Sequence, residues 1–250
     1  MKKIIGIIPA RYGSTRLEGK PLVDICGKTM IQRVYEQVKK AIKYAVVATD
    51  DKRIFDAVIQ FGGKVVMTST NHTTGTNRCL EALEKYQKEI GIIFDVVLNI
   101  QGDEPLLEPK QITSLISCFE NTKTQMATLV MPTNKASELK SGVFVVFDKN
   151  KNALYFSRAV IPVVRDEKKE EWHIKNTFYK HVGMYGFTPN SLIKFANMEQ
   201  TNLENQEKLE QLRWLENGNK ISVAITLHNS VPVDTKEDVE KVIRILKNKR

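Results

Sequence analysis

The 250-residue sequence lacks any apolar run that approaches the roughly 20 residues needed to span a bilayer. Its first apolar run, Ile4 to Ile8, follows two lysines and superficially resembles the start of a signal peptide. The run is too short for one and Pro9-Ala10-Arg11 ends it, so we expect neither a signal peptide nor insertion into a membrane.

Cysteine is scarce, and Cys26, Cys79 and Cys118 lie far apart. Their spacing matches no metal site, and any disulfide scheme leaves one of them unpaired. This pattern is typical of small thiols in a reducing compartment, so we expect a cytoplasmic protein. The spacing also supports no Ser-His-Asp or Cys-His catalytic arrangement.

Basic residues are plentiful, with a net charge of +9, but they are not gathered into a dense patch. A nucleic-acid interface needs cations on one face with interleaved aromatic residues, and neither feature can be read here. The charge is also suited to steering a small polyanionic substrate. We therefore expect no nucleic-acid partner. Nucleic-acid binding by a basic protein is the alternative function from a different class.

Apolar segments typical of strands alternate with helix-length segments over the first 130 residues. This alternation predicts an α/β fold with a mostly parallel central sheet and helices on both faces. No repeat or linker interrupts the chain, so we expect a single domain over residues 1–250. The expected strands are Ile4–Ile8, Ala45–Ala48, Val65–Met67, Val96–Ile100 and Met126–Val130, and the expected helices are Met30–Lys43, Asp51–Phe61, Thr76–Ile90 and Lys110–Phe119.

The alternation of strand-like and helix-length segments ends at about residue 140. A β-hairpin is expected from Val143–Phe147 and Ala153–Phe156, followed by an exposed, charged stretch over residues 164–177. The remaining expected elements are a strand at Tyr179–Phe187, a helix over Glu204–Asn217 ended by Gly218, a strand at Ile221–Leu227 and a final helix capped by Thr235 and Asp238.

A loop rich in glycine and cations follows the first strand. Glycines permit close approach or positive φ, hydroxyl and backbone N–H groups can donate to phosphate oxygens, and the cations balance their charge. We interpret the loop as a triphosphate cradle; the alternative is a solvated basic turn. Its spacing is neither that of a P-loop nor GxGxxG. The residues concerned are Arg11, Gly13, Ser14, Thr15, Arg16, Gly19 and Lys20.

Two carboxylates are candidate ligands for a Mg²⁺ ion held by phosphates. Asp103 follows the strand that ends near Ile100, and Asp234 precedes the last helix. The alternatives are an Asx turn or helix cap for Asp103 and a cap for Asp234. Asp50 and Asp51 are expected to cap the helix that follows them.

Three further side chains are candidates for a small-ligand site. By two-residue alternation, His181 and Tyr185 share a strand face with Gly183, which leaves room beside them. Arg158 can bind a carboxylate in a bidentate manner. The alternatives are a structural histidine and a surface ion pair, and His72 is expected to be a surface histidine.

Seven motifs in order resemble those of the 3-deoxy-manno-octulosonate (Kdo) cytidylyltransferases, also called CMP-Kdo synthetases. The match covers nearly the whole chain, and its specificity comes from the order of the motifs. They are Pro9-Ala10-Arg11-Tyr12-x-Ser14-x-Arg16-x-x-Gly19-Lys20-Pro21-Leu22, Ala48-Thr49-Asp50-Asp51, Gly75-Thr76-x-Arg78, Asn99-x-Gln101-Gly102-Asp103-x-Pro105, Tyr155-Phe156-Ser157-Arg158, Leu209-Glu210-Gln211-Leu212-Arg213 and Val233-Asp234-Thr235.

The resemblance implies a Rossmann-like nucleotide-diphospho-sugar transferase fold, a homodimer and a cytoplasmic enzyme that uses CTP and Mg²⁺. It implies transfer of CMP to the anomeric hydroxyl of an acidic ulosonic sugar, with release of pyrophosphate, for lipopolysaccharide or capsule synthesis. By the same resemblance, residues of about 140–187 form the hairpin and a part that serves sugar binding and dimerisation.

Residue roles follow from the positions of the motifs. The resemblance implies that Lys20, Arg11, Asp103 and Asp234 are catalytic and that the two aspartates bind Mg²⁺. It implies CTP contacts from Ala10, Arg11, Ser14, Arg16, Lys20, Thr76 and Arg78, and sugar contacts from Gln101, Arg158, His181, Tyr185, Glu210 and Gln211.

The chain departs from the family pattern at several places. Glu18 replaces a proline, Asn77 replaces an acidic residue, Phe144 stands where a lysine is usual, and Pro232-Val233-Asp234 lacks a glycine. These departures leave the sugar open between Kdo, an amino-substituted analogue such as 8-amino-3,8-dideoxy-octulosonate, and a capsule sugar acid.

Overall fold

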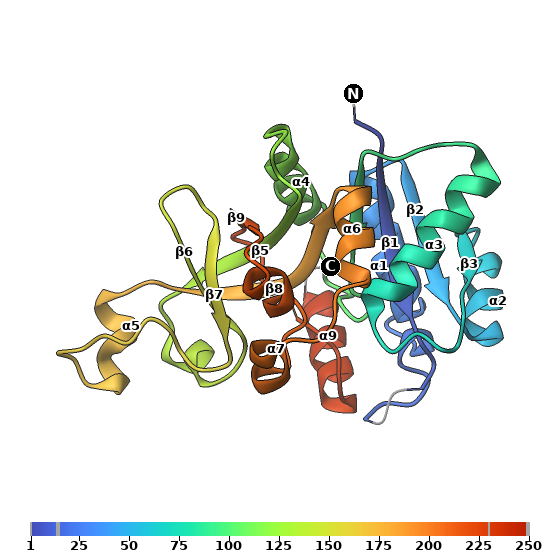
Figure 1. Cartoon of the computed structure of the whole chain (residues 1–250). Helices are drawn as coiled ribbons and strands as arrows, with labels where there is room; N and C mark the ends of the chain where they lie inside the picture. The colour runs from blue at the N-terminus through green and yellow to red at the C-terminus, as the bar shows by residue number, and fades with distance from the viewer. Residues whose placement is uncertain (1, 14–15, 230, 249–250) are drawn as a thin grey trace. The chain divides into compact units, whose positions relative to one another are not determined.

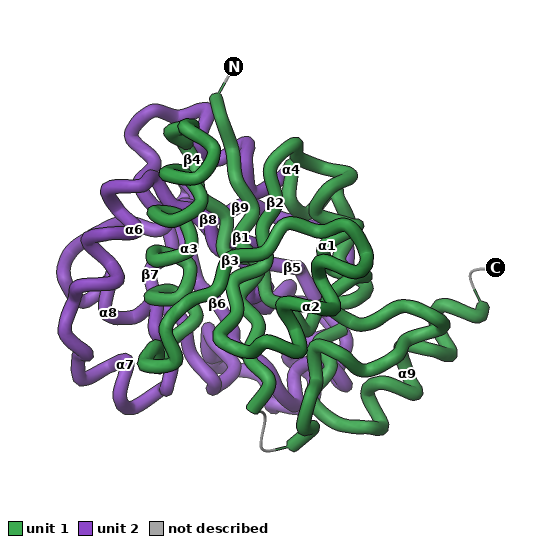
Figure 2. Tube along the Cα trace, turned by 90° about the vertical axis from the view of Figure 1, so that its right-hand side faces the viewer, with its two compact units in different colours: residues 1–113, 230–250 green, residues 114–229 purple. Residues whose placement is uncertain are grey.

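The chain is divided into two compact units, which Figure 2 draws in different colours. Unit 1 comprises residues 1–113 and 230–250, and unit 2 comprises residues 114–229. The computed structural model describes residues 2–13, 16–229 and 231–248. Within these residues, no helix is both long and apolar enough to cross a membrane.

Unit 1 is built on parallel strands in the order β3-β2-β1-β4. They are β1 (Ile4–Ala10), β2 (Tyr44–Thr49), β3 (Val65–Met67) and β4 (Val96–Asn99). Ile7 pairs with Val46 on one side and with Asn99 on the other, so β1 is central. Its isoleucines Ile5, Ile7 and Ile8 are fully buried, as expected for a parallel sheet covered on both faces.

Helices cover both faces of these strands. Figure 2 shows α3 on one side of them and α1 and α2 on the other. A side-chain oxygen caps each of these three helices at its first turn, from Thr29, Asp51 and Thr74. The helices of this unit are η1 (Lys20–Leu22), α1 (Met30–Ala41), α2 (Lys52–Gln60), α3 (Gly75–Ile90) and α9 (Lys236–Asn248), and the unit boundary falls within α4 (Pro109–Ser117). The predicted α/β class with a parallel sheet is confirmed.

Unit 2 is centred on β5, which pairs antiparallel with β8 and parallel with β9. A bulge shifts the β5–β8 register between Thr128, opposite Tyr185, and Leu129, opposite Val182. The predicted hairpin is confirmed as β6 against β7. The strands are β5 (Met126–Thr133), β6 (Phe144–Phe147), β7 (Ala153–Ser157), β8 (Phe178–Phe187) and β9 (Ser222–Ile225).

Short helices complete unit 2 and include the main departure from the predicted elements (Figure 1). The single helix predicted over Glu204–Asn217 is wrong: Lys208, at φ 53°, separates α7 (Asn202–Glu207) from α8 (Leu212–Glu216). Across this break Arg213 Nε donates to the buried Glu204 carboxylate at 2.7 Å. The other helices are η2 (Cys118–Glu120), η3 (Ala136–Lys140), η4 (Lys169–Glu171), α5 (Trp172–Lys175) and α6 (Pro189–Ala196).

The remaining end signals are confirmed. Gly218 follows α8 with φ 73°, and its N–H donates to the Leu215 carbonyl at 2.9 Å. At α9, Asp238 Oδ2 accepts from the Thr235 N–H at 2.9 Å, while Thr235 Oγ1 accepts from the Asp238 N–H at 3.3 Å. This reciprocal pair is the capping box that the sequence predicts.

Candidate active site

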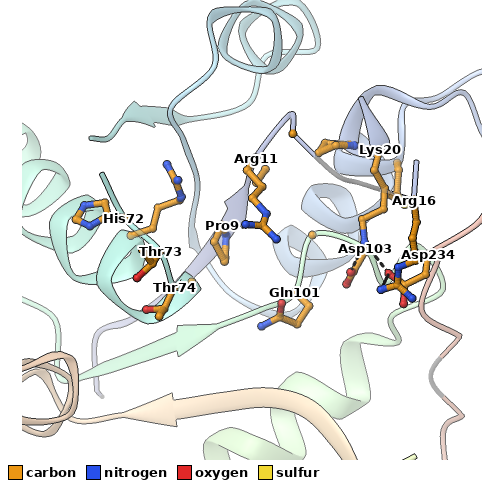
Figure 3. A pocket seen from close by; sticks show the side chains of 17 residues that line it. Pro9, Arg11, Arg16, Lys20, His72, Thr73, Thr74, Gln101, Asp103 and Asp234 are labelled. Atoms are coloured by element: carbon orange, nitrogen blue, oxygen red, sulfur yellow. Dashed lines mark hydrogen bonds and ion pairs between the residues drawn. The ribbon is translucent and has the colours of Figure 1, made fainter. Parts of the chain in front are cut away.

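A cavity of about 470 Å³ opens in unit 1 beyond the carboxyl ends of β1 and β4. This is the edge at which open α/β sheets bind ligands, and the volume suits a small molecule. Most of its lining is polar or charged (Figure 3). The lining residues are Pro9, Ala10, Arg11, Gly13, Arg16, Lys20, Pro21, Met30, His72, Thr73, Thr74, Gly75, Arg78, Gln101, Gly102, Asp103 and Asp234.

The described part of the loop that leaves β1, residues 11–13 and 16–19 and here named the phosphate loop, contributes Arg11, Gly13 and Arg16 to the lining of the cavity. Gly19 has φ 65°, the left-handed conformation that glycine adopts without strain, and it is the N-cap of η1. Lys20 is therefore the first residue of η1, and its side chain is only 15% exposed. Arg11 is exposed, and no described carboxylate forms an ion pair with it, so its guanidinium is available to an anion. Ser14, which the sequence places in this cradle, lies outside the described residues.

The two predicted metal ligands converge on one positively charged atom. Lys20 Nζ donates to Asp103 Oδ2 at 2.7 Å and to Asp234 Oδ1 at 3.2 Å. Arg16 also pairs with Asp234, at 3.0 Å. Figure 3 shows Lys20 between the two aspartates with Arg16 beside them. Carboxylates 131 positions apart in sequence thus face a common point.

The convergence has a clear cause in the backbone. The Val233 N–H donates to the Asp103 carbonyl at 2.9 Å, which ties the C-terminal segment to the loop after β4. The Val233 side chain is fully buried in an apolar cluster with Met30 and Val242. Because Asp234 is the next residue, this anchor sets its position. Gly102 adds a close approach: a Cβ there would lie 3.0 Å from the Pro9 carbonyl oxygen.

The structure separates the capping aspartates from the others. Asp238, not Asp234, accepts the N–H hydrogen bonds at the start of α9. Asp51 caps α2 as predicted, but the cap predicted for Asp50 is wrong. The Asp50 carboxylate instead accepts from Arg78 Nη2 at 2.7 Å.

A second group of residues, contributed by the segment that enters α3, lines the cavity. Figure 3 shows His72, Thr73 and Thr74 on the side away from Asp103 and Asp234. Arg78 is held there by its ion pair with Asp50 and by donation from Nη1 to Thr68 Oγ1 at 2.6 Å. Ala10 and Gln101 line the cavity as well, whereas Thr76 is buried and is not part of the lining.

His72 is a cavity residue that the sequence interpretation treated as an ordinary surface histidine. Its Nε2 hydrogen-bonds to the Glu81 carboxylate, which also accepts from the Ser69 N–H at 2.9 Å and pairs with Lys85 at 2.7 Å. Partial burial pushes the pKa of Glu81 upward, but these hydrogen bonds outweigh it and lower the pKa to about 2. Its position in the sequence could have indicated this role, because His72 lies three residues before the Gly75-Thr76-x-Arg78 motif.

The donor set suits a divalent cation shared with a polyanion. Four lysines and arginines line the cavity against two carboxylates, so anions are favoured overall. No group of three or more His, Cys, Asp or Glu side chains that could hold a metal ion occurs in the part of the chain that the structure describes. Two carboxylates facing one cation are nonetheless a recognised Mg²⁺ arrangement when phosphates and waters supply the remaining oxygens.

The predicted sugar-site residues other than Gln101 lie in unit 2. His181 and Tyr185 are neighbours on β8, with ring centroids 5.2 Å apart. Burial lowers the pKa of His181 to about 3, and burial together with the Glu210 carboxylate raises the pKa of Tyr185 well above its usual range. Thr128 Oγ1 donates to the Met184 carbonyl at 2.8 Å and lies 2.8 Å from His181 Nε2. The Nε2 atom must therefore carry the proton, which leaves Nδ1 as an acceptor.

Arg158 and Gln211 have contrasting surroundings in the same unit. Arg158 Nε and Nη2 donate to the carbonyls of Glu207 and Lys208 at 2.6 and 3.2 Å. The Glu207 carboxylate accepts from the Arg158 backbone N–H instead, so no guanidinium ion pair forms with it. Gln211 is buried, and its Nε2 donor has no hydrogen-bond partner among the described residues.

Known proteins with similar sequences place this geometry in context. A family model described as Cytidylyltransferase matches residues 5–221. A 3-deoxy-manno-octulosonate cytidylyltransferase of Parabacteroides distasonis is 52% identical, with 100% of each chain covered. A protein of the same name from Fusobacterium nucleatum is 49% identical and covers 98% of this chain and 97% of its own.

Solved structures agree with the sequence relatives. A CMP:2-keto-3-deoxy-manno-octonic acid synthetase, solved in complex with CTP, is similar with a TM-score of 0.89 and 37% identity, covering 99% of this chain and 100% of its own. A 4-diphosphocytidyl-2C-methyl-D-erythritol synthase from Anaerococcus prevotii has a TM-score of 0.62 at 15% identity, which extends the likeness in fold alone. It covers 98% of this chain and 96% of its own.

Proposed function

The chain belongs to the 3-deoxy-manno-octulosonate cytidylyltransferase family, and on this basis we propose that it transfers CMP from CTP to the anomeric hydroxyl of Kdo, releasing pyrophosphate. The observation that carries the proposal is the convergence of Asp103 and Asp234 on Lys20 Nζ in a cavity walled by a cationic loop. Such an arrangement can hold a nucleoside triphosphate and its metal ion in a fixed position.

In this proposal Asp103 and Asp234 hold a Mg²⁺ ion, and the convergence of their carboxylates on one cation supports the fit. When bound, the ion neutralises phosphate charge and orients the triphosphate for displacement at the α-phosphorus. The chain's own contribution is to keep the two carboxylates together through the Val233 anchor.

The cations of the cavity have complementary roles. Arg11, Arg16 and Lys20 hold the triphosphate and stabilise the charge that builds up on the departing pyrophosphate. Ala10, Thr76, Arg78 and the hydroxyl of Ser14 belong to the same proposed CTP site. His72, Thr73 and Thr74 line the end of the cavity that we assign to the nucleoside.

Binding of the sugar acid is proposed for Gln101 of unit 1 and for Arg158, His181, Tyr185, Glu210 and Gln211 of unit 2. The unpartnered amide donor of Gln211 and the acceptor Nδ1 of His181 support contacts to sugar hydroxyls.

Replacing Arg158 by alanine is expected to raise KM for the sugar acid at least tenfold and KM for CTP less than twofold. The exposed Lys123, changed to alanine, is the matched control. Equal loss for both substrates would contradict a carboxylate-binding role for Arg158.

The cellular setting belongs to the same proposal. The three described cysteines are free thiols, which supports a cytoplasmic enzyme that supplies activated sugar for lipopolysaccharide or capsule. We further propose that the protein works as a homodimer and that residues 1–250 act as one catalytic domain, because the matches to its relatives extend across both units.

The decisive experiment for function measures pyrophosphate release from each of CTP, UTP, ATP and GTP. Each nucleotide is paired with Kdo, 8-amino-3,8-dideoxy-octulosonate and a nine-carbon ulosonic acid, with Mg²⁺ present. We expect turnover with CTP and Kdo, and at least tenfold lower kcat/KM for the other pairs. Preference for the amino sugar would replace Kdo by that substrate, and the absence of turnover with every pair would contradict the proposal.

A further inference from the structure

A stacked pair of side chains supports the phosphate loop from outside the cavity. The Cζ atom of Arg53, from α2, lies 3.2 Å from the centroid of the Tyr12 ring. This distance is characteristic of a guanidinium lying flat on an aromatic face. Neither residue lines the cavity, so their contact is separate from the ligand-facing set.

Arg53 is itself held in position by Asp51. Arg53 Nε donates to Asp51 Oδ1 at 3.0 Å and Nη2 donates to Oδ2 at 2.7 Å, which is a bidentate pair. Asp51 is fixed in turn because it caps α2 through the Arg53 backbone N–H at 2.9 Å. The orientation of the guanidinium is therefore set by the N-terminus of α2, a helix that packs against the parallel strands β2 and β3.

Tyr12 also lies against Gly19. A Cβ at Gly19 would lie 3.0 Å from the Tyr12 hydroxyl oxygen and 3.1 Å from its Cζ, so the ring occupies the space beside this glycine. The Gly19 N–H also donates to the Tyr12 carbonyl at 3.2 Å. Tyr12, near the start of the phosphate loop, thus contacts Gly19 at its end, and Gly19 directly precedes Lys20.

We propose that Arg53 is a positioning residue for nucleotide use: by pressing Tyr12 against Gly19, it holds the phosphate loop in the shape that presents Arg11, Arg16 and Lys20 to the triphosphate. This inference rests on the proposed function for its substrate, while the brace itself is a property of the free protein. Arg53 does not line the cavity, so its effect is preorganisation of the groups that do.

The test uses the full-length protein with four single substitutions. Arg53→Gln and Tyr12→Leu remove the stack, Tyr12→Phe keeps the ring, and Lys52→Gln removes a neighbouring cation that is 80% exposed and pairs with Asp56. The first measurement is the hydrogen exchange rate of the Gly19 amide by NMR, which needs no substrate. We expect exchange at least tenfold faster in Arg53→Gln and Tyr12→Leu, and less than twofold changed in the two controls.

The second measurement is steady-state kinetics with the same proteins. We expect KM for CTP to rise at least tenfold in Arg53→Gln and Tyr12→Leu, with KM for the sugar acid changed less than twofold. A further protein that carries both Arg53→Gln and Tyr12→Leu should be no worse than either single variant, because each substitution removes the same interaction. Unchanged Gly19 exchange in Arg53→Gln would overturn the brace, and so would a comparable effect of Lys52→Gln on KM for CTP.

The two arms also separate this inference from the proposed function. A wild-type protein that turns over no CTP contradicts the proposed function, and the exchange measurement still decides whether Arg53 braces the loop. A wild-type protein that turns over CTP, with both readouts unchanged in Arg53→Gln, overturns only the positioning role.

Discussion

Single residues in this protein differ in role according to the partners that the fold gives them. Asp50, Asp51 and Asp234 are all acidic residues just ahead of a helix or its cap, yet only Asp51 caps one. Asp50 orients Arg78, and Asp234 faces Lys20. The roles of Asp50 and Asp234 are decided by cations that lie far away in the sequence, and a local sequence pattern does not identify these partners.

Glu81 provides the clearest test of such a partner because its ionisation is coupled to folding. Its pKa is about 2 in the folded protein against an ordinary value of 4.5, so its hydrogen bonds contribute stability above pH 4.5. That contribution is lost as the pH falls from about 4.5 to 2. We expect Glu81→Gln to lower Tm at pH 7 and the difference from wild type to shrink towards zero at pH 2.

Thermal unfolding of both proteins from pH 2 to pH 7 measures this difference, and Glu84→Gln on the same helix is the matched control. A gap between wild type and Glu81→Gln that stays constant over this range would show that Glu81 gains nothing from ionisation in the fold.

At the scale of elements, the C-terminal segment is as important to the site as the first strand. It places Asp234 at the cavity through the hydrogen bond from the Val233 N–H to the Asp103 carbonyl and through the burial of the Val233 side chain. Thr235 and Asp238 then start α9 immediately afterwards. The site therefore depends on packing far from the phosphate loop in sequence.

Truncating Val233 tests this dependence. Val233→Ala removes two buried methyl groups, and we expect a loss of about 2 kcal/mol in the free energy of unfolding. Because Asp234 follows directly, we also expect at least a fivefold higher Mg²⁺ concentration for half-maximal activity. Urea unfolding and a Mg²⁺ titration measure the two effects. The control, Ile93→Ala at a 71% exposed position, should change neither, and a variant that loses stability but keeps its Mg²⁺ dependence would contradict the anchoring role.

Elements with their own sequence signals could be predicted, and elements decided by tertiary contacts could not. The parallel strands, the hairpin, the Gly218 end and the Thr235 cap all follow from local apolar patterns and turn residues. No glycine or proline marks the break between α7 and α8 at Lys208, and the buried ion pair Glu204–Arg213 spans this break. In the site, the loop cations and Asp103 followed from composition and strand ends, whereas His72 depended on a contact with Glu81 that spacing alone does not specify.

For the whole molecule, the proposed homodimer has a candidate surface in unit 2. Val163 is 70% exposed and Ile174 is 66% exposed in the segment between β7 and β8, where apolar exposure is costly for a lone chain. We expect the wild-type protein to sediment at twice the mass of one chain. A Val163→Glu, Ile174→Glu variant should sediment as a single chain, with Leu227→Glu as the exposed apolar control. A wild-type protein that sediments as a single chain would contradict the dimer.

The central claim is that two distant carboxylates of unit 1 hold the metal ion that a cytidylyl transfer requires. The most direct measurement is Mg²⁺-dependent pyrophosphate release from CTP and Kdo by Asp103→Asn, with circular dichroism to verify folding. Asp56→Asn, an exposed aspartate paired with Lys52, is the matched control. We predict at least a thousandfold loss of rate in Asp103→Asn and a rate within twofold of wild type in Asp56→Asn. A folded Asp103→Asn protein with near-normal turnover would contradict the claim.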